Sequence, residues 1–123
     1  MKAAELEALG RRAAACPRWR WTPGMTILGS KGRRVVVIGL SGAPEATSGM
    51  TSRAIGPDEL PDLSSPATLG CLLALARDAY GDPSFVVRCV AGLWYEESNR
   101  RALVARGSDT EAEALVAALE AAP

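Results

Sequence analysis

The stretch between Ser65 and Pro83 constrains the fold most, because it predicts a helix with almost no polar face. Ser65 is a suitable N-cap, Pro66 fits the first helical turn, and Gly81 shortly before Pro83 ends the helix. Apolar side chains recur at helical spacing, and they are Leu69, Leu72, Leu73, Ala76 and Tyr80. A helix over 66–80 therefore has to be buried on most of its sides.

Two further residues, Cys71 and Leu75, lie outside the main stripe of this predicted helix and widen its apolar arc. Two arrangements would bury them: packing within the same chain, or packing against a second copy of it. We expect a homo-oligomer, with Cys71 and Leu75 on the oligomer face.

The remaining pattern predicts α+β architecture in a single domain over residues 1–123. The expected elements are a helix over 3–15, strands over 25–28, 33–38, 50–55, 85–90, 93–95 and 100–106, a loop over 41–49, a surface connection over 58–65 and a turn over 96–99. A capping box of Ser108 and Glu111 predicts the last helix. Because strands occur in runs joined by short turns, we expect one antiparallel sheet of about four to six strands, with three helices packed on one face.

The sequence contains no histidine, which excludes Ser-His-Asp and Cys-His hydrolysis and imidazole-containing zinc sites. Its three cysteines form no CxxC pair, so they indicate free thiols in a reducing cytoplasm. Carboxylates that could pair for catalysis or magnesium binding fall in turns and helix ends, where solvation explains them: Asp58, Glu59, Asp62, Asp78, Asp82, Glu96 and Glu97. We expect a protein that is not an enzyme, with no catalytic residues, no cofactor and no metal.

Two glycine-containing stretches superficially resemble nucleotide-binding loops, and both fail on spacing. Between Gly24 and Lys31, the lysine does not directly follow the second glycine, as a Walker motif requires. In residues 35–42, Ser41 stands where a dinucleotide-binding fingerprint needs glycine. We interpret both sets of glycines as loop glycines.

The best candidate for a binding patch is the basic, tryptophan-containing N-terminal segment. Its members are Arg11, Arg12, Arg18, Trp19, Arg20, Trp21, Arg33 and Arg34. Aromatic faces can stack on unpaired bases while guanidinium groups hold phosphates, which favours weak single-stranded nucleic-acid binding. The alternation of 18–21 equally predicts a strand whose two tryptophans cover the core while its arginines face water.

Charge is distributed unevenly although the formal net charge is zero. Residues 1–34 hold eight bases against two acids, and residues 35–123 hold six bases against twelve acids. This asymmetry indicates either an anionic partner for the basic end or two segments that lie against each other, within a chain or across a dimer.

Two segments carry a resemblance to a known group of proteins. Residues 61–83, with the sequence PDLSSPATLGCLLALARDAYGDP, and residues 111–120, with the sequence EAEALVAALE, resemble parts of small uncharacterised bacteriophage and prophage proteins. Ser65 stands where that group is expected to have aspartate, and either residue can cap a helix. The resemblance covers about a third of the chain and implies a phage-type origin, without an activity or cofactor to transfer.

These observations lead to one expected function and one alternative. We expect a non-enzymatic cytoplasmic interaction protein of phage or prophage type, which binds a host or phage macromolecule as a homo-oligomer. The alternative is weak binding of single-stranded nucleic acid by the basic segment. No membrane span is expected, since the longest apolar run, residues 69–76, is far shorter than the ~20 residues that cross a bilayer.

Overall fold

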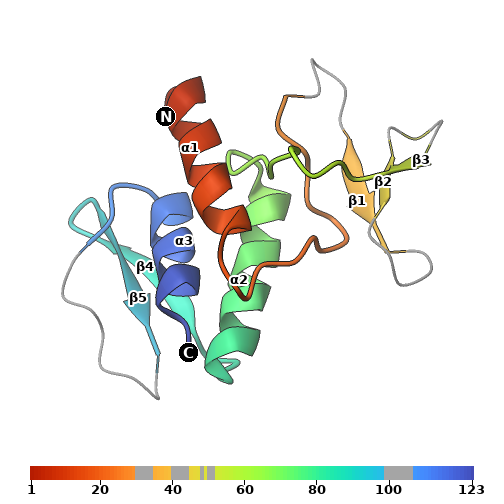
Figure 1. Ribbon diagram of the computed structural model, residues 1–123. Helices are drawn as coiled ribbons and strands as arrows, with labels where there is room; N and C mark the ends of the chain where they lie inside the picture. The colour runs from red at the N-terminus through yellow and green to blue at the C-terminus, as the bar shows by residue number, and fades with distance from the viewer. Residues whose placement is uncertain (30–34, 40–44, 48, 50–51, 99–106) are drawn as a thin grey trace.

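The computed structural model describes residues 1–29, 35–39, 45–47, 49, 52–98 and 107–123 (Figure 1). Its elements, in chain order, are α1 (Ala3–Ala14), β1 (Val36–Ile38), β2 (Glu45–Thr47), β3 (Ser52–Ala54), α2 (Pro66–Tyr80), β4 (Val86–Val90), β5 (Leu93–Glu97) and α3 (Glu111–Ala121). Helices and antiparallel strands occur together, so the α+β class is confirmed.

The described strands form two separate antiparallel sheets instead of the single sheet that we expected. One sheet has the order β1-β2-β3, and the other is the β4-β5 hairpin. In Figure 1 the three helices lie between the two sheets and do not line one face of one sheet. The reason is the connection between them, because the 15 residues of α2 carry the chain over about 22 Å, at 1.5 Å per residue, before β4 begins.

The loop predicted over 41–49 is wrong at Glu45–Thr47, which form the central strand β2. Ala46 pairs with Val37 on one side and with Arg53 on the other, and it is buried. Glutamate and alanine have weak strand propensity by themselves, so pairing to strands on both edges overrides the local preference here. The edge strand predicted over 50–55 is confirmed for Ser52–Ala54.

The segments 25–28 and 33–38, both predicted as strands, pair with each other where the structure describes them. The Gly24 amide donates to the Val37 oxygen at 2.9 Å, and the Val37 amide donates to the Met25 oxygen at 2.8 Å. Thr26 and Ile27 form only isolated bridges, Thr26 with Val36 and Ile27 with Pro61. They do not belong to a longer strand.

Helix α2 starts and ends as predicted, although Ser65 contributes differently from the expectation. Ser65 lies at the N-cap position, where its side chain makes no capping hydrogen bond and its main-chain oxygen accepts from the Leu69 amide at 3.1 Å. At the other end Gly81 adopts the left-handed conformation, with φ of 60°, that terminates helices.

The last helix begins at Glu111, so Ser108 is not its N-cap as the predicted capping box requires. Thr110 is the N-cap, and its Oγ1 accepts a hydrogen bond from the Glu113 amide at 3.1 Å. Ser108 is instead held by Trp94, with which it exchanges two main-chain hydrogen bonds of 2.8 Å. Because Ser108 pairs with β5, the chain can turn into α3 only after it.

The core lies where α1, α2 and α3 meet. Helix α2 packs against α3, and α3 also contacts α1, β4 and β5. The largest fully buried apolar side chains come from the helices and from the segments that cross them, and they are Phe85, Met25, Leu63, Leu72, Leu115, Leu119, Val37 and Val116. The connection over 58–65 is thus ordered, and its Leu63 belongs to the core.

A two-residue turn joins β4 to β5. The turn predicted over 96–99 is wrong at Glu96 and Glu97, which belong to β5, and Asn99 lies outside the described residues. Ala91 and Gly92 both have positive φ, of 52° and 81°. Two consecutive positive φ values define the type I′ turn, whose twist matches that of a hairpin. The strand predicted over 100–106 lies outside the described residues.

The strain at Ala91 yields a direct prediction. Ala91→Asn should raise the free energy of unfolding by roughly 0.5–1 kcal/mol, because asparagine tolerates this backbone conformation and alanine does not. Urea unfolding followed by circular dichroism measures the change. Ala91→Val should have the opposite sign, and equal effects of the two substitutions would contradict the assigned turn.

Candidate functional site

The arginines of the basic N-terminal segment all donate to acceptors within the chain where the structure describes them. Arg11 pairs with Glu7 one helical turn away, and Arg12 reaches Glu120 of α3, with 2.5 Å between Nη2 and Oε1. The hydrogen bond that Arg12 donates to Glu120 is the main cause of a raised pKa of Arg12. Two of the predicted patch residues, Arg33 and Arg34, lie outside the described residues.

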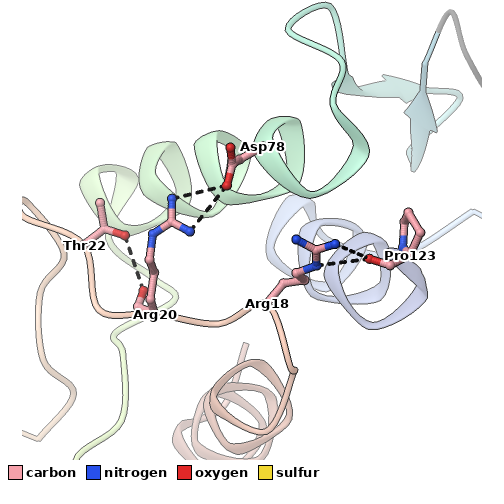
Figure 2. A network of polar contacts seen from close by, with 5 residues as sticks. All are labelled: Arg18, Arg20, Thr22, Asp78 and Pro123. Carbon is pink, nitrogen blue, oxygen red and sulfur yellow. Dashed lines mark hydrogen bonds and ion pairs between the residues drawn. The ribbon is translucent and has the colours of Figure 1, made fainter.

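Arg18 and Arg20 make similar contacts with the ends of two helices (Figure 2). Arg18 donates from Nε and Nη2 to the main-chain oxygen of Pro123, at 3.0 and 2.8 Å. Arg20 points toward α2, where Nη1 and Nη2 each lie 3.4 Å from Oδ2 of Asp78. The segment from Arg18 to Arg20 is therefore bound to residues far along the sequence.

The two tryptophans between these arginines pack against each other and against the core. Their ring centroids are 5.5 Å apart at an interplanar angle of 74°, an edge-to-face contact. Trp19 and Trp21 are half-buried and border the main apolar cluster. Much of their surface is therefore covered by the fold, which leaves less of each ring for stacking on a base.

These contacts account for part of the uneven charge of the sequence. Arg12 with Glu120 and Arg20 with Asp78 join bases of residues 1–34 to acids of residues 35–123. The interpretation that the two segments lie against each other within one chain is confirmed for these pairs. Exposed ion pairs of this kind contribute about 0–1 kcal/mol each, so they neutralise charge more than they stabilise.

Leu75, one of the two residues of the expected oligomer face, does not lie on the surface. Leu75 is 2% exposed and belongs to the core between the helices, so no second copy can reach it. Cys71 is half-buried, and its Sγ lies 3.6 Å from the main-chain oxygen of Pro23. Burial also raises the pKa of Cys71. The part of the apolar arc of α2 around Leu75 is thus covered by the chain itself.

Asp82 is the buried carboxylate of the described residues, and it organises the connection between α2 and β4. Its Oδ1 accepts from the amide and the hydroxyl of Ser84, at 2.9 and 2.6 Å. Its Oδ2 accepts from the Ser98 hydroxyl at 2.5 Å, which ties the connection to the end of β5. This carboxylate is held by structural hydrogen bonds and is 3% exposed.

Other acids line two grooves beside α3. One, of about 400 Å³, lies between α1 and the start of α3 and includes Glu5, Asp109 and Glu113. The second groove, of about 530 Å³, also includes Asp109 and Glu113, together with Glu96. Burial raises the pKa of Glu96. Within the described parts of the chain, no group of three acids, cysteines or histidines is arranged to hold a metal ion.

The β4-β5 hairpin has two different faces. Val87 packs against the core, and Glu96, its cross-strand partner, lines a groove with residues of α3, so this face looks toward α3. Alternation of side chains places the other set on the outer face, and these residues are Val86, Arg88, Val90, Leu93, Tyr95 and Glu97. This set lies on the face that α3 does not cover.

The far half of the hairpin exposes apolar side chains. Val90 is 53% exposed and Leu93 is 36% exposed, and with Met1 they are the large exposed hydrophobic residues among those described. Val90 and Leu93 are also direct cross-strand partners, so their side chains lie next to each other. Arg88, which is exposed, pairs with Glu97 at 3.0 Å on the same face. A shallow pocket of about 380 Å³ opens between these charged residues, Val90 and Tyr95.

Comparison with known proteins identifies no relative. No family model, curated protein or solved structure matches this chain. The resemblance to phage proteins therefore stays a prediction, and function has to be argued from the surface of the molecule. In the described part of the chain, no helix has both the length and the apolar character needed to cross a membrane.

The sequence did not single out this hairpin surface, although a signal was present. Strand 86–90 has the sequence VVRCV, in which both alternating sets contain apolar residues. A strand that is apolar on both faces either is buried on both sides or exposes one apolar face. The pattern cannot distinguish these outcomes, since it does not tell how far α3 extends over the hairpin.

Proposed function

We propose that this chain is a binding protein without catalytic activity, which contacts a macromolecular partner through the outer face of the β4-β5 hairpin. The observation that carries the proposal is the adjacency of Val90 and Leu93, two exposed apolar side chains at the tip of a projecting hairpin. Exposed apolar residues that cluster, instead of being scattered singly, are typical of interaction sites.

The available side-chain chemistry supports contact over turnover. The sequence has no histidine. Asp82, the acid that is buried, is already engaged by Ser84 and Ser98 in holding a turn. A general acid or base needs access to substrate and a pKa near the working pH, and the position of Asp82 does not offer that access.

The partner class follows from the sequence expectations. We propose a host or phage protein met in the cytoplasm, where three free cysteines would stay reduced. We also propose that the chain forms a homo-oligomer, with its contact surface on the hairpin and not at Cys71 and Leu75.

Paired variants of the hairpin test this function. Val90→Asp combined with Leu93→Asp places two charges on the outer face and should abolish contact with partner chains, because burying unpaired carboxylates is costly. Cys89→Asp is the matched control, since Cys89 is exposed on the same strand but on the opposite face. Circular dichroism confirms that each variant is folded.

Two readouts apply to these variants: sedimentation velocity for self-association, and capture of proteins from a lysate of the producing cells. An association that the wild-type chain and Cys89→Asp share, and that the double variant loses, supports the proposal. Associations that the double variant retains would refute it, as would conversion of a small molecule by the pure protein.

The alternative of single-stranded nucleic-acid binding has less support, because the described arginines of the basic segment donate to acceptors of the chain itself. We expect no shift in fluorescence anisotropy when a labelled single-stranded oligonucleotide is titrated with the protein at low salt. Binding that falls steeply with salt and weakens in Arg18→Ala and Trp19→Ala would overturn this expectation and favour the alternative.

A further inference from the structure

The long edge of strand β4 that faces away from β5 is a surface distinct from the outer face of the hairpin. We propose that this edge binds an extended peptide segment of a partner protein, which joins the β4-β5 sheet as an added antiparallel strand. The inference rests on the proposed function, because it specifies how a partner engages the same hairpin. It follows from the direction of main-chain hydrogen bonds, the exposure of β4 and the position of Arg88.

The turn of the hairpin decides which main-chain groups of β4 face β5. In a hairpin closed by a two-residue type I′ turn, the residues that flank the turn exchange two hydrogen bonds, and bonded pairs then alternate along the ladder. Val90 and Leu93 flank the turn, so Val90 and then Arg88 bond to β5. Val87 and Cys89 lie between these positions, and their amides and oxygens therefore point away from β5.

Strand β5 shows the same alternation from its own side. Trp94, the cross-strand partner of Cys89, exchanges two main-chain hydrogen bonds of 2.8 Å with Ser108, which lies beyond β5. The antiparallel pattern then directs the main-chain groups of Cys89 the other way, out of the sheet. In the described part of the chain, no strand or bridge lies on that side of β4, and neither Val87 nor Cys89 makes a main-chain hydrogen bond there.

One position on this edge is satisfied by the chain itself. Phe85 lies two residues before Val87, and its main-chain oxygen accepts from Nε of Arg77 at 2.8 Å. Further along the strand, residues 88–90 are exposed. The open stretch therefore presents the amides and oxygens of two residues, which lie about 6.8 Å apart at 3.4 Å per residue.

Donors and acceptors at this spacing select an extended main chain as the occupant. A strand in antiparallel pairing presents an amide and an oxygen from every second residue, which matches the two open residues of β4. A helix does not, because its amides and oxygens are bonded within the helix. Since main-chain hydrogen bonds carry little sequence information, the side chains beside the edge have to specify the partner.

The side chains of β4 predict the partner's sequence pattern. Arg88 is the charged residue of this strand, and a residue paired with it lies on the same face of the sheet. Nε of Arg88 contacts Glu97 at 3.0 Å, and the guanidinium has further donors for a second carboxylate. Val86 and Val90 lie two residues to either side on that face. The expected segment is therefore apolar–x–acid–x–apolar, where x is a residue of high strand propensity.

A synthetic peptide tests this pattern on the full chain. The probe is a short fluorescent peptide with Val-Thr-Glu-Thr-Val at its centre, titrated at low salt and followed by anisotropy. Because the contact is small, we expect a Kd between about 10 µM and about 1 mM. Lysine in place of the glutamate should weaken binding roughly threefold to tenfold, and Arg88→Glu should reverse this preference. An unchanged preference in Arg88→Glu would overturn the assigned pairing.

N-methylation of the peptide tests the main-chain hydrogen bonds without altering the protein. In the proposed pairing the two threonines bond to Val87 and Cys89, whereas the amide of the central glutamate points away from β4. N-methylation of both threonines should weaken binding at least about tenfold, and N-methylation of the glutamate, the matched control, less than about threefold. Equal effects would overturn strand addition, and the reverse order would overturn the antiparallel direction.

Amide hydrogen exchange of the unaltered protein, measured by NMR, locates the added strand. With the peptide at about ten times its Kd, the amides of Val87 and Cys89 should exchange about tenfold more slowly than in the free protein. Bound peptide that leaves both amides unprotected would overturn the edge as the site.

Cys89→Pro gives the corresponding test on the protein. Proline is tolerated in an edge strand where the missing amide faces solvent, so the hairpin should persist, which circular dichroism checks. Binding of the probe should fall at least about tenfold, while Cys89→Ala, which keeps the amide, should bind as the wild type does. A cellular partner that requires Val90 and Leu93 but is retained by Cys89→Pro would uphold the proposed function and overturn strand addition, so the two failures are distinguishable.

Discussion

Phe85→Ala should lower the free energy of unfolding by about 3–5 kcal/mol, the cost of truncating a fully buried aromatic residue. Phe85 is 1% exposed and stacks on Tyr80, with ring centroids 5.0 Å apart and an interplanar angle of 5°. It also packs against Ala76 of α2 and Ala118 of α3. Its side chain thus joins both helices at the point where the chain enters β4.

Alanines on both neighbouring helices cannot expand to fill the cavity, which places the expected loss at the upper part of this range. Urea unfolding measured by tryptophan fluorescence gives the change. Phe85→Leu keeps most of the volume and should cost less than half as much. A loss below about 1 kcal/mol for Phe85→Ala would show that this contact between α2, α3 and β4 is assigned wrongly.

Asp82→Ala should lower the free energy of unfolding by about 3 kcal/mol, because hydrogen bonds to a charged acceptor contribute about 1.5–3 kcal/mol and several are lost together. The donors left behind are the amide and hydroxyl of Ser84 and the hydroxyl of Ser98. Ser98 directly follows β5, so the loss should also loosen the base of the hairpin. Thermal and urea unfolding measure the stability change.

Asp82→Asn separates the two halves of this site. An asparagine oxygen can still accept from Ser84, as in other turns of this kind, but the amide nitrogen cannot accept from Ser98. The asparagine variant should therefore lose less stability than the alanine variant. A double-mutant cycle with Ser98→Ala measures the coupling, and a coupling energy near zero would contradict the bridge between the α2-β4 connection and β5.

Helix-level features of the molecule could be predicted from the sequence because they depend on neighbours along the chain. The apolar spacing from Leu69 to Tyr80, closed by Gly81, predicted α2 to the residue. The hairpin strands were also predicted, although β5 extends to Glu97 instead of ending at Tyr95. Pairing with β4 holds Glu96 and Glu97 in the strand, and local turn preference for acids misplaced this boundary.

The candidate site could be predicted only in part. The basic segment was recognised from its arginines and tryptophans, but the acceptors Asp78, Glu120 and Pro123 lie too far along the chain to be anticipated. The hairpin tip was missed, because exposure of Val90 depends on where α3 stops covering the strands.

By itself, the sequence determined which segments are helical, the α+β class and the absence of imidazole chemistry, since caps, periodicity and composition act locally or need no structure at all. The tertiary structure alone decided that Leu75 lies inside one chain, that the described strands divide into two sheets, and that Val90 and Leu93 are exposed at the tip of the hairpin. Burial is a property of contacts between residues distant in sequence, and the same apolar side chain becomes core or contact surface according to what the fold places against it.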